Sequence, residues 1–278
     1  MIFYCSNPNT DNEMTSLRLE RAYLLDVRRM FESGDVIAIV PIGSTEQHGP
    51  HLPFSTDAII AESISLEVAD RLRDELNILV APTIRIGCSA EHMDFPGTLS
   101  LRPETMISLI KDVCTSLSAH GVKKIVLLNA HGGNTSLLKG IIHQLRREID
   151  ALIVMVDTWS ILPGILAEVR ESPAGGAVHA GEAETSLMLA LDESLVRWAR
   201  VRSELPRTDS ENRYFVIEKP RYISFSWCTA DVSRSGVIGD PTKANREKGR
   251  RILNFMIDVI CEILKELSEL NLARGSKP

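Results

Sequence analysis

The sequence predicts an α/β fold in which helices cover a mainly parallel sheet. From residue 36 onward, short apolar runs alternate with longer segments of helical periodicity, the pattern that strands and crossover helices give in such folds. The apolar runs are rich in Val, Ile and Leu, as expected of strands that are buried on both faces. Strands are therefore expected at residues 36–42, 78–86, 123–129 and 151–157.

Four helices are expected between and after these strands. The first follows Asp57, and the second begins at Pro103, in the first-turn position that proline tolerates. Asn134 or Thr135 is expected to cap the third, and a long amphipathic helix follows Pro241. The region 205–239 mixes prolines with short β-prone pieces at 214–217 and 222–227, which predicts irregular hairpins. With no repeat and no Gly/Ser-rich linker, the whole chain, 1–278, is expected to form one domain.

Composition narrows the classes of protein to consider. Lys and Arg number 31 against 37 Asp and Glu, for a net charge of -6, and the absence of a basic stripe disfavours nucleic-acid binding. The five cysteines form no C-x-x-C pair, which predicts neither a disulfide framework nor a thiolate zinc site. We find no signal peptide and no apolar run near the roughly 20 residues that cross a bilayer. A cytoplasmic protein that does not enter membranes is expected.

The loop after the first predicted strand carries a candidate metal-binding motif. Within residues 43–57, Glu46 and His48 stand two positions apart, and Asp57 follows at the start of the next helix. On an extended loop Glu46 and His48 point the same way, and carboxylate with imidazole suits zinc, manganese or iron. The alternative is a polar loop whose glycine and prolines serve turns and whose Asp57 only caps a helix.

A second motif favours the metal site over that alternative. His131-Gly132-Gly133-Asn134 directly follows the predicted strand 123–129, so it lies at the same carboxyl edge of the sheet as the first loop. That edge is where open α/β sheets bind ligands.

The third motif leads into another helical run. It reads His179-Ala180-Gly181-Glu182-Ala183-Glu184-Thr185-Ser186. Glu182 and Glu184 face different sides of a helix that begins near Ala180, so one of them is expected to face the site, and the spacing does not choose which. Acidic residues in a first helical turn also stabilise the helix without any catalytic role.

Taken in order, these motifs resemble those of the creatininase family. The matching stretches are E-Q-H-G-P-H-L-P, the following Asp57, N-A-H-G-G-N and H-A-G-E-A-E-T-S, with Glu91-His92, Phe95-Pro96-Gly97-Thr98 and residues 236–241 also included. The resemblance implies a three-layer αβα sandwich, homo-oligomers that are often hexamers, and two divalent ions, such as Zn, Mn or Fe, per chain. By residue matching, Glu46 and His131 serve one ion, His48 serves the other, and Asp57 bridges them.

The resemblance also implies amide hydrolysis by metal-activated water. His179 is the expected proton shuttle, with a structural histidine as the alternative, and Glu184 is expected to orient it or act as a base. Creatininases carry a Glu two residues after the matched His as a ligand of the second ion, but Gly133 stands there in this chain. Glu184 is our hypothesis for the missing ligand, and water or substrate are the alternatives. Creatininases also carry a Trp where Gly175 stands, so creatinine is not the expected substrate.

The expected function is hydrolysis of a C-N bond in a small amide, formamide, lactam or short peptide. Two other classes remain open at this point. One is metal-dependent cleavage of another bond, such as a C-C bond in a cyclic ketone. The other is a metal-stabilised binding subunit without turnover. Four candidate ligands with an open metal position favour an enzyme over a binding subunit.

Overall fold

Four parallel strands form the central sheet of the computed structural model, which describes residues 18–206, 208, 211–218 and 223–272. The strands are β1 (Ile37–Ile42), β2 (Ile78–Val80), β3 (Lys124–Asn129) and β4 (Leu152–Asp157). They lie in the order β2-β1-β3-β4, and every neighbouring pair is parallel. All four expected strands are present.

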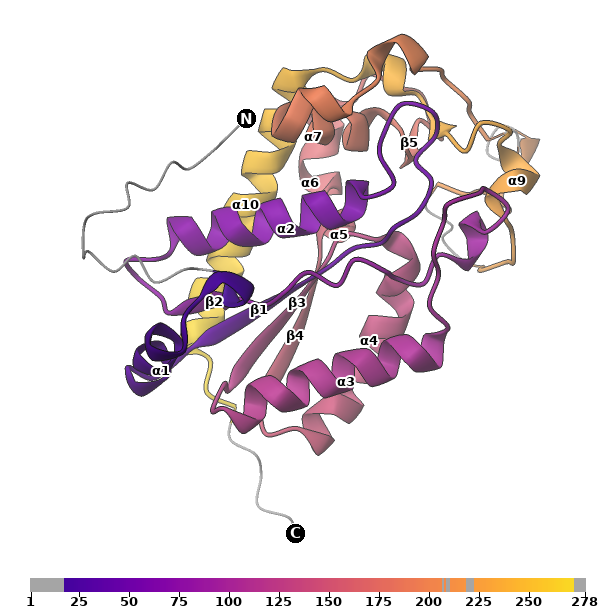
Figure 1. Cartoon of the computed structure of the whole chain (residues 1–278). Helices are drawn as coiled ribbons and strands as arrows, with labels where there is room; N and C mark the ends of the chain where they lie inside the picture. Colours follow the sequence, from indigo (N-terminus) through magenta and orange to yellow (C-terminus); the bar gives the residue numbers. More distant parts are fainter. Residues whose placement is uncertain (1–17, 207, 209–210, 219–222, 273–278) are drawn as a thin grey trace.

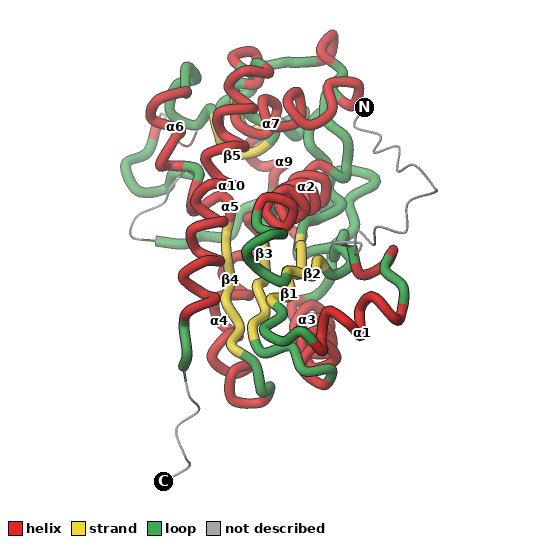
Figure 2. Tube along the Cα trace, turned by 90° about the vertical axis from the view of Figure 1, so that its left-hand side faces the viewer, coloured by secondary structure: helices red, strands yellow, loops and turns green. Residues whose placement is uncertain are grey.

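Helices cover both faces of this sheet (Figures 1 and 2). β1 is buried along its whole length, because its alternating side chains point into two separate apolar layers. Ile39 packs in one layer with residues of α2, α7 and α10, and Val40 packs in the other with residues of α3 and α4. This arrangement confirms the expected three-layer αβα sandwich with a mainly parallel sheet.

Five long helices make up most of the two outer layers. They are α2 (Thr56–Arg71), α3 (Pro103–Ala119), α4 (Gly132–Glu148), α7 (Glu182–Asp192) and α10 (Arg246–Glu269). Shorter elements complete the described chain: η1 (Leu19–Arg21), α1 (Leu24–Glu32), η2 (Ala90–His92), α5 (Thr158–Ile161), α6 (Pro163–Val169), β5 (Ala177–His179), η3 (Glu193–Leu195), η4 (Trp198–Arg200), α9 (Thr229–Val232), β6 (Ile238–Gly239) and η5 (Pro241–Lys243). No helix in the described ranges is both long and apolar enough to span a membrane.

Two expected boundaries were wrong. β2 ends at Val80 rather than at residue 86, because Pro82 cannot donate a ladder hydrogen bond, and pairing resumes only as a single bridge at Ile84. Neither Asn134 nor Thr135 caps α4, which begins at Gly132. The Asn134 side chain instead accepts a hydrogen bond from the backbone of Cys88 at 2.9 Å. It ties the start of α4 to the loop that follows β2.

The expected hairpins of region 205–239 are absent from its described residues, which hold no strand before β6. β6 pairs antiparallel with β5, which ends at His179. Glu204 joins the same ladder at its edge, because its backbone exchanges two hydrogen bonds with Gly239. Tyr222, the first residue of one expected strand, lies outside the described residues. The small β5-β6 sheet fixes the entry to α7.

Candidate metal centre

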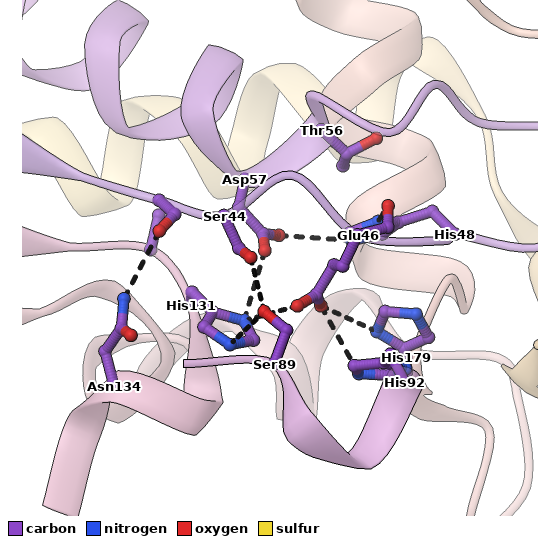
Figure 3. Close-up of polar contacts among 12 residues, drawn as sticks. Ser44, Glu46, His48, Thr56, Asp57, Ser89, His92, His131, Asn134 and His179 are labelled. Carbon is purple, nitrogen blue, oxygen red and sulfur yellow. Dashed lines mark hydrogen bonds and ion pairs between the residues drawn. The ribbon is translucent and has the colours of Figure 1, made fainter. Parts of the chain in front are cut away.

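The predicted ligands meet at the carboxyl edge of the central sheet (Figure 3). Glu46 and His48 lie on the loop after β1, Asp57 lies in the first turn of α2, and His131 follows β3. Each of these four side chains is at most 3% exposed. Buried carboxylates at such density are costly unless cations or protons balance their charge.

Glu46, Asp57 and His131 form the first candidate ligand set. His131 Nδ1 lies 3.3 Å from Glu46 Oε2 and 3.2 Å from Asp57 Oδ2. Both carboxylate oxygens are buried, and neither accepts a hydrogen bond from the described residues. Because buried polar atoms are almost always satisfied, two unsatisfied oxygens beside an imidazole nitrogen fit a divalent cation.

His48, Asp57 and Glu184 form the second candidate ligand set. Their ligand atoms all lie within 4.8 Å of one another, as do those of the first set. His48 Nε2 is 3.1 Å from Asp57 Oδ1, whereas the other oxygen of Asp57 faces His131. Asp57 therefore presents one oxygen to each set, the arrangement that a carboxylate bridging two ions requires.

Backbone carbonyls fix the tautomers of the two ligand histidines. His131 Nε2 lies 2.8 Å from the carbonyl oxygen of Cys88, and His48 Nδ1 lies 3.1 Å from that of Glu46. A carbonyl oxygen only accepts, so these two nitrogens are the donors. His131 Nδ1 and His48 Nε2 face the carboxylates and are therefore the nitrogens that a metal ion could bind once they lose a proton, as in metal sites whose ligands are oriented by outer hydrogen bonds.

The pKa values of the candidate ligands in the metal-free protein also show that the buried carboxylates favour positive charge beside them. Burial lowers the pKa of His48, but Asp57 and two glutamates outweigh burial and raise it to about 10. The pKa of His131 is likewise raised well above its ordinary value, because Glu46 and Asp57 overcome its burial. Burial raises the pKa of Glu184 to about 7 against the opposing charge of His48. Protons therefore occupy the positions that the donor set offers to cations.

His179 and His92 lie next to each other beside Glu46 (Figure 3), with their ring centroids 4.3 Å apart. His179 Nε2 donates to the backbone oxygen of Gln47 at 2.7 Å, and its Nδ1 lies 3.8 Å from Glu46 Oε1. Burial and the neighbouring His92 and His48 hold the pKa of His179 well below its ordinary range. Its neutral ring turns an unprotonated nitrogen toward the cluster, and it can also complete a third possible ligand set with Glu46 and His48.

Several contributors were missed by the sequence reasoning. His92, whose role the sequence left open, has its Nε2 3.3 Å from Glu46 Oε1. Its Nδ1 lies 2.9 Å from Gln47 Nε2 and 2.8 Å from Thr229 Oγ1. Ser89 Oγ lies 3.3 Å from His131 Nε2. The position of Gln47 between the candidate ligands Glu46 and His48 could have indicated that its side chain lies near the site. Nothing in the sequence pointed to Thr229.

Comparison with known proteins identifies the family. The family model described as "Creatininase: Creatinine amidohydrolase" matches residues 24–264, which include every ligand named above. The chain belongs to the creatininase family. It is therefore a metal-dependent amidohydrolase that acts on C-N bonds.

Relatives of known name share most of this creatininase-family chain. A mycofactocin precursor peptide peptidase of Mycobacterium ulcerans is 36% identical over 226 residues, covering 79% of this chain and 81% of that protein. A creatinine amidohydrolase of Pseudomonas putida is 29% identical over 249 residues, covering 84% and 90%. The structure "Creatininase Mn" superposes with a TM-score of 0.79 at 27% identity, covering 92% of this chain and 100% of that chain. Another similar structure is titled a "Zn-Zn type" creatininase mutant.

The family's second-metal glutamate has no room in this creatininase-family chain. A Cβ atom at Gly133 would overlap the carbonyl oxygen of Cys88, and would lie 2.5 Å from His131 Nε2 and 2.9 Å from Glu91 Oε1. Glu184, from α7, stands with His48 and Asp57 instead. The second candidate set therefore has three donor residues without a side chain at position 133.

A cavity of about 600 Å³ opens beside the ligand sets, and its lining includes Glu46, Asp57, His131 and Glu184. This volume lies within the roughly 300–1,000 Å³ of sites that enclose small molecules. Trp159, Leu162, Leu166 and Trp227 contribute an apolar wall. Trp159 is held in place because its Nε1-H donates to the carbonyl oxygen of Ala130 at 2.8 Å. The cavity is therefore large enough to enclose a small molecule.

Proposed function

We propose that this chain hydrolyses a C-N bond of a small amide or short peptide with two divalent ions. Glu46, Asp57 and His131 would hold one ion, and His48, Asp57 and Glu184 would hold the other. The observation that carries this proposal is the position of Asp57, whose two oxygens face the two ligand sets separately. Carboxylate and imidazole donors suit Zn, Mn or Fe, and the titles of similar structures name Mn and Zn.

The backbone and the ligands have distinct tasks in this proposal. Two bound ions supply Lewis acidity, which polarises a scissile carbonyl and lowers the pKa of the attacking water. Gly132 and Gly133 line the cavity at the start of α4, where the first backbone N-H groups of a helix lack intrahelical partners. These N-H groups stabilise the negative charge that develops on the carbonyl oxygen.

His179 carries the proton in this proposal. The backbone oxygen of Gln47 fixes its Nε2-H, so Nδ1 accepts a proton from the attacking water and returns it to the leaving nitrogen. A His179→Gln variant is expected to lose about 10²–10⁴-fold in kcat, the range typical of a general acid-base group, and to keep its full metal content. Loss of one metal from this variant would show instead that His179 is a ligand.

Metal content tests the ligand assignment. The parent protein, a Glu184→Gln variant and a His131→Ala variant are loaded with Zn²⁺ or Mn²⁺, and bound metal per chain is measured by elemental analysis. We expect two equivalents in the parent and at most one in each variant. A His143→Ala variant is the control, because His143 is exposed on α4. A parent that retains no metal after loading would refute the proposal.

Activity is then screened by release of ammonia or amine from a panel of amides, formamides, lactams and short peptides. The names of the relatives support small molecules and peptides as the classes to include. We further propose that the protein works in the cytoplasm as a homo-oligomer, with the hexamer as the form implied by the family resemblance. Analytical ultracentrifugation tests that assembly.

A further inference from the structure

Two carboxylates that line the cavity, Glu91 and Glu218, have no part in either ligand set, and Glu218 forms an ion pair with Arg170. Glu91 lies on η2, at the loop after β2, and lines the cavity. It belongs to none of the candidate metal-ligand groups found in the described ranges. None of the Lys and Arg side chains among the described residues forms an ion pair with it. Among the described residues, the cation that acts on Glu91 is His131, whose charge opposes the effect of burial on its pKa. This partly buried carboxylate therefore faces the cavity without a Lys or Arg partner from that part of the chain, although such charges are normally paired.

The absence of a side chain at Gly133 leaves space for the Glu91 carboxylate. Glu91 Oε1 lies 2.9 Å from the position of a Cβ atom at residue 133. A glutamate at position 133 would therefore collide with Glu91 and add a further negative charge beside Glu46 and Asp57. In the proposed function the metal ligand would come from Glu184 on α7, whereas the Glu91 carboxylate lies at the start of α4 and lines the cavity.

The rest of the cavity defines what that molecule carries. Among its described lining residues there is no Lys or Arg, whereas Trp159, Leu162, Leu166 and Trp227 are apolar or aromatic. Burial raises the pKa of the Glu91 carboxyl group, and a cation that pairs with the carboxylate offsets this cost. An apolar wall and a carboxylate that has no Lys or Arg partner among the described residues, next to a hydrolytic centre, complement an apolar substrate that carries a positive charge.

We infer that Glu91 binds the ammonium group of the substrate, so that the site selects amides with a free amine and an apolar side chain. α-Amino amides and unblocked peptide N-termini belong to this class. The inference rests on the proposed function, because the ammonium group is recognised beside the amide that the metal centre cleaves. Glu91 is thus a specificity-determining residue, and it is not required for metal binding.

Two hydroxamates that differ only in the amine test this inference. Hydroxamates chelate metal ions, so binding is measured without turnover. L-phenylalanine hydroxamate carries an α-amine, and 3-phenylpropanohydroxamic acid lacks it. Titration calorimetry is performed on metal-loaded protein at about pH 6.5, below the α-amino pKa of about 7.7, so that the amine is charged. Metal content is measured on the same samples.

The parent is expected to bind the cationic hydroxamate at least about tenfold more tightly than the neutral one, because a hydrogen bond between charged groups contributes about that much to affinity. Glu91→Gln should remove most of this preference, and keep both the affinity for the neutral probe and the metal content. Asp94→Asn is the matched control, because Asp94 is exposed on the same turn and does not line the cavity. This control should keep the parental preference.

Other results overturn the inference. Equal affinities in a metal-loaded parent would refute recognition of the amine and leave the proposed metal centre intact. A Glu91→Gln variant that weakens both probes equally, or loses metal, would give Glu91 a structural or ligand role instead. A parent that binds no metal overturns the inference together with the proposed function.

Discussion

Adding one methyl group at Gly133 tests how tightly the start of α4 is built around the metal centre. The new Cβ atom would overlap the carbonyl oxygen of Cys88 and lie 2.5 Å from His131 Nε2. Neither neighbour can move cheaply, because the first is backbone and the second belongs to a buried ring. His131 Nε2 also donates to that same carbonyl oxygen at 2.8 Å, so relief of the overlap disturbs the bond that orients this ligand.

The expected cost follows from these contacts. Overpacking against rigid neighbours destabilises by about 1–3 kcal/mol, and here the upper half applies because a backbone atom is hit. Replacing glycine by alanine inside a helix returns up to about 1 kcal/mol. The net loss is therefore about 2 kcal/mol, which lowers the Tm of a chain of this size by about 4–8 °C. Thermal melting of the metal-free protein measures this change without a contribution from metal binding.

Gly140 provides the matched control on the same helix, since a Cβ atom there meets nothing within 4 Å. Gly140→Ala should raise stability by about 0.5–1 kcal/mol. Gly133→Ala should also bind less metal when loaded beside the parent. A Gly133→Ala variant that melts at or above the parental temperature and binds the full amount of metal would refute the close-packing argument.

Two further predictions concern charge. Lys248 is 8% exposed and forms ion pairs with Glu182 and Glu171. Lys248→Met should lower the free energy of unfolding by about 2–3 kcal/mol, because the buried carboxylate of Glu182 loses its cation. Urea denaturation measures this loss, and an unchanged midpoint would contradict it. His48 has a pKa raised to about 10 in the metal-free protein, so it holds a proton at pH 8 that a metal ion must displace. The affinity for Zn²⁺ should therefore rise with pH until about pH 10. Calorimetry in two buffers of different ionisation enthalpy should detect the protons released on metal binding. Equal heats of binding in both buffers would contradict the release of a proton from His48.

The sequence predicted the sheet and the clustering of ligands well, for a physical reason. Strands buried on both faces, such as β1 and β3, are nearly uninterrupted apolar runs, and parallel strands deliver the residues that follow them to one edge. Glu46 and His131 are 85 residues apart in the chain, yet that topology alone places them together. No details of packing were needed to expect this meeting.

Local boundaries depended on contacts that the sequence does not encode locally. Asn134 has the side chain of a good helix cap, but it bonds to Cys88 and Gly43, which come from two other loops. Helix α4 starts at Gly132, with His131 as its N-cap, three residues before the start that an Asn134 cap would give. Contacts with distant segments therefore outweighed the local preference of Asn134 for a helix cap. Thr229 contacts His92 from another distant segment, so the local sequence around Thr229 could not predict its role either.

The choice between Glu182 and Glu184 shows where spacing stops being informative. Ala180, directly after β5, adopts φ +51°, a left-handed conformation that costs a non-glycine residue energy. This turn sends Glu184 back toward the cluster, where its carboxylate accepts the Ala180 N-H. Glu182 points the other way, and accepts N-H groups from Glu171 and Ser172 beside Lys248. Both glutamates suit a first helical turn, so spacing alone does not distinguish them, and their different partners in the fold show that Glu184 faces the candidate ligands and Glu182 does not.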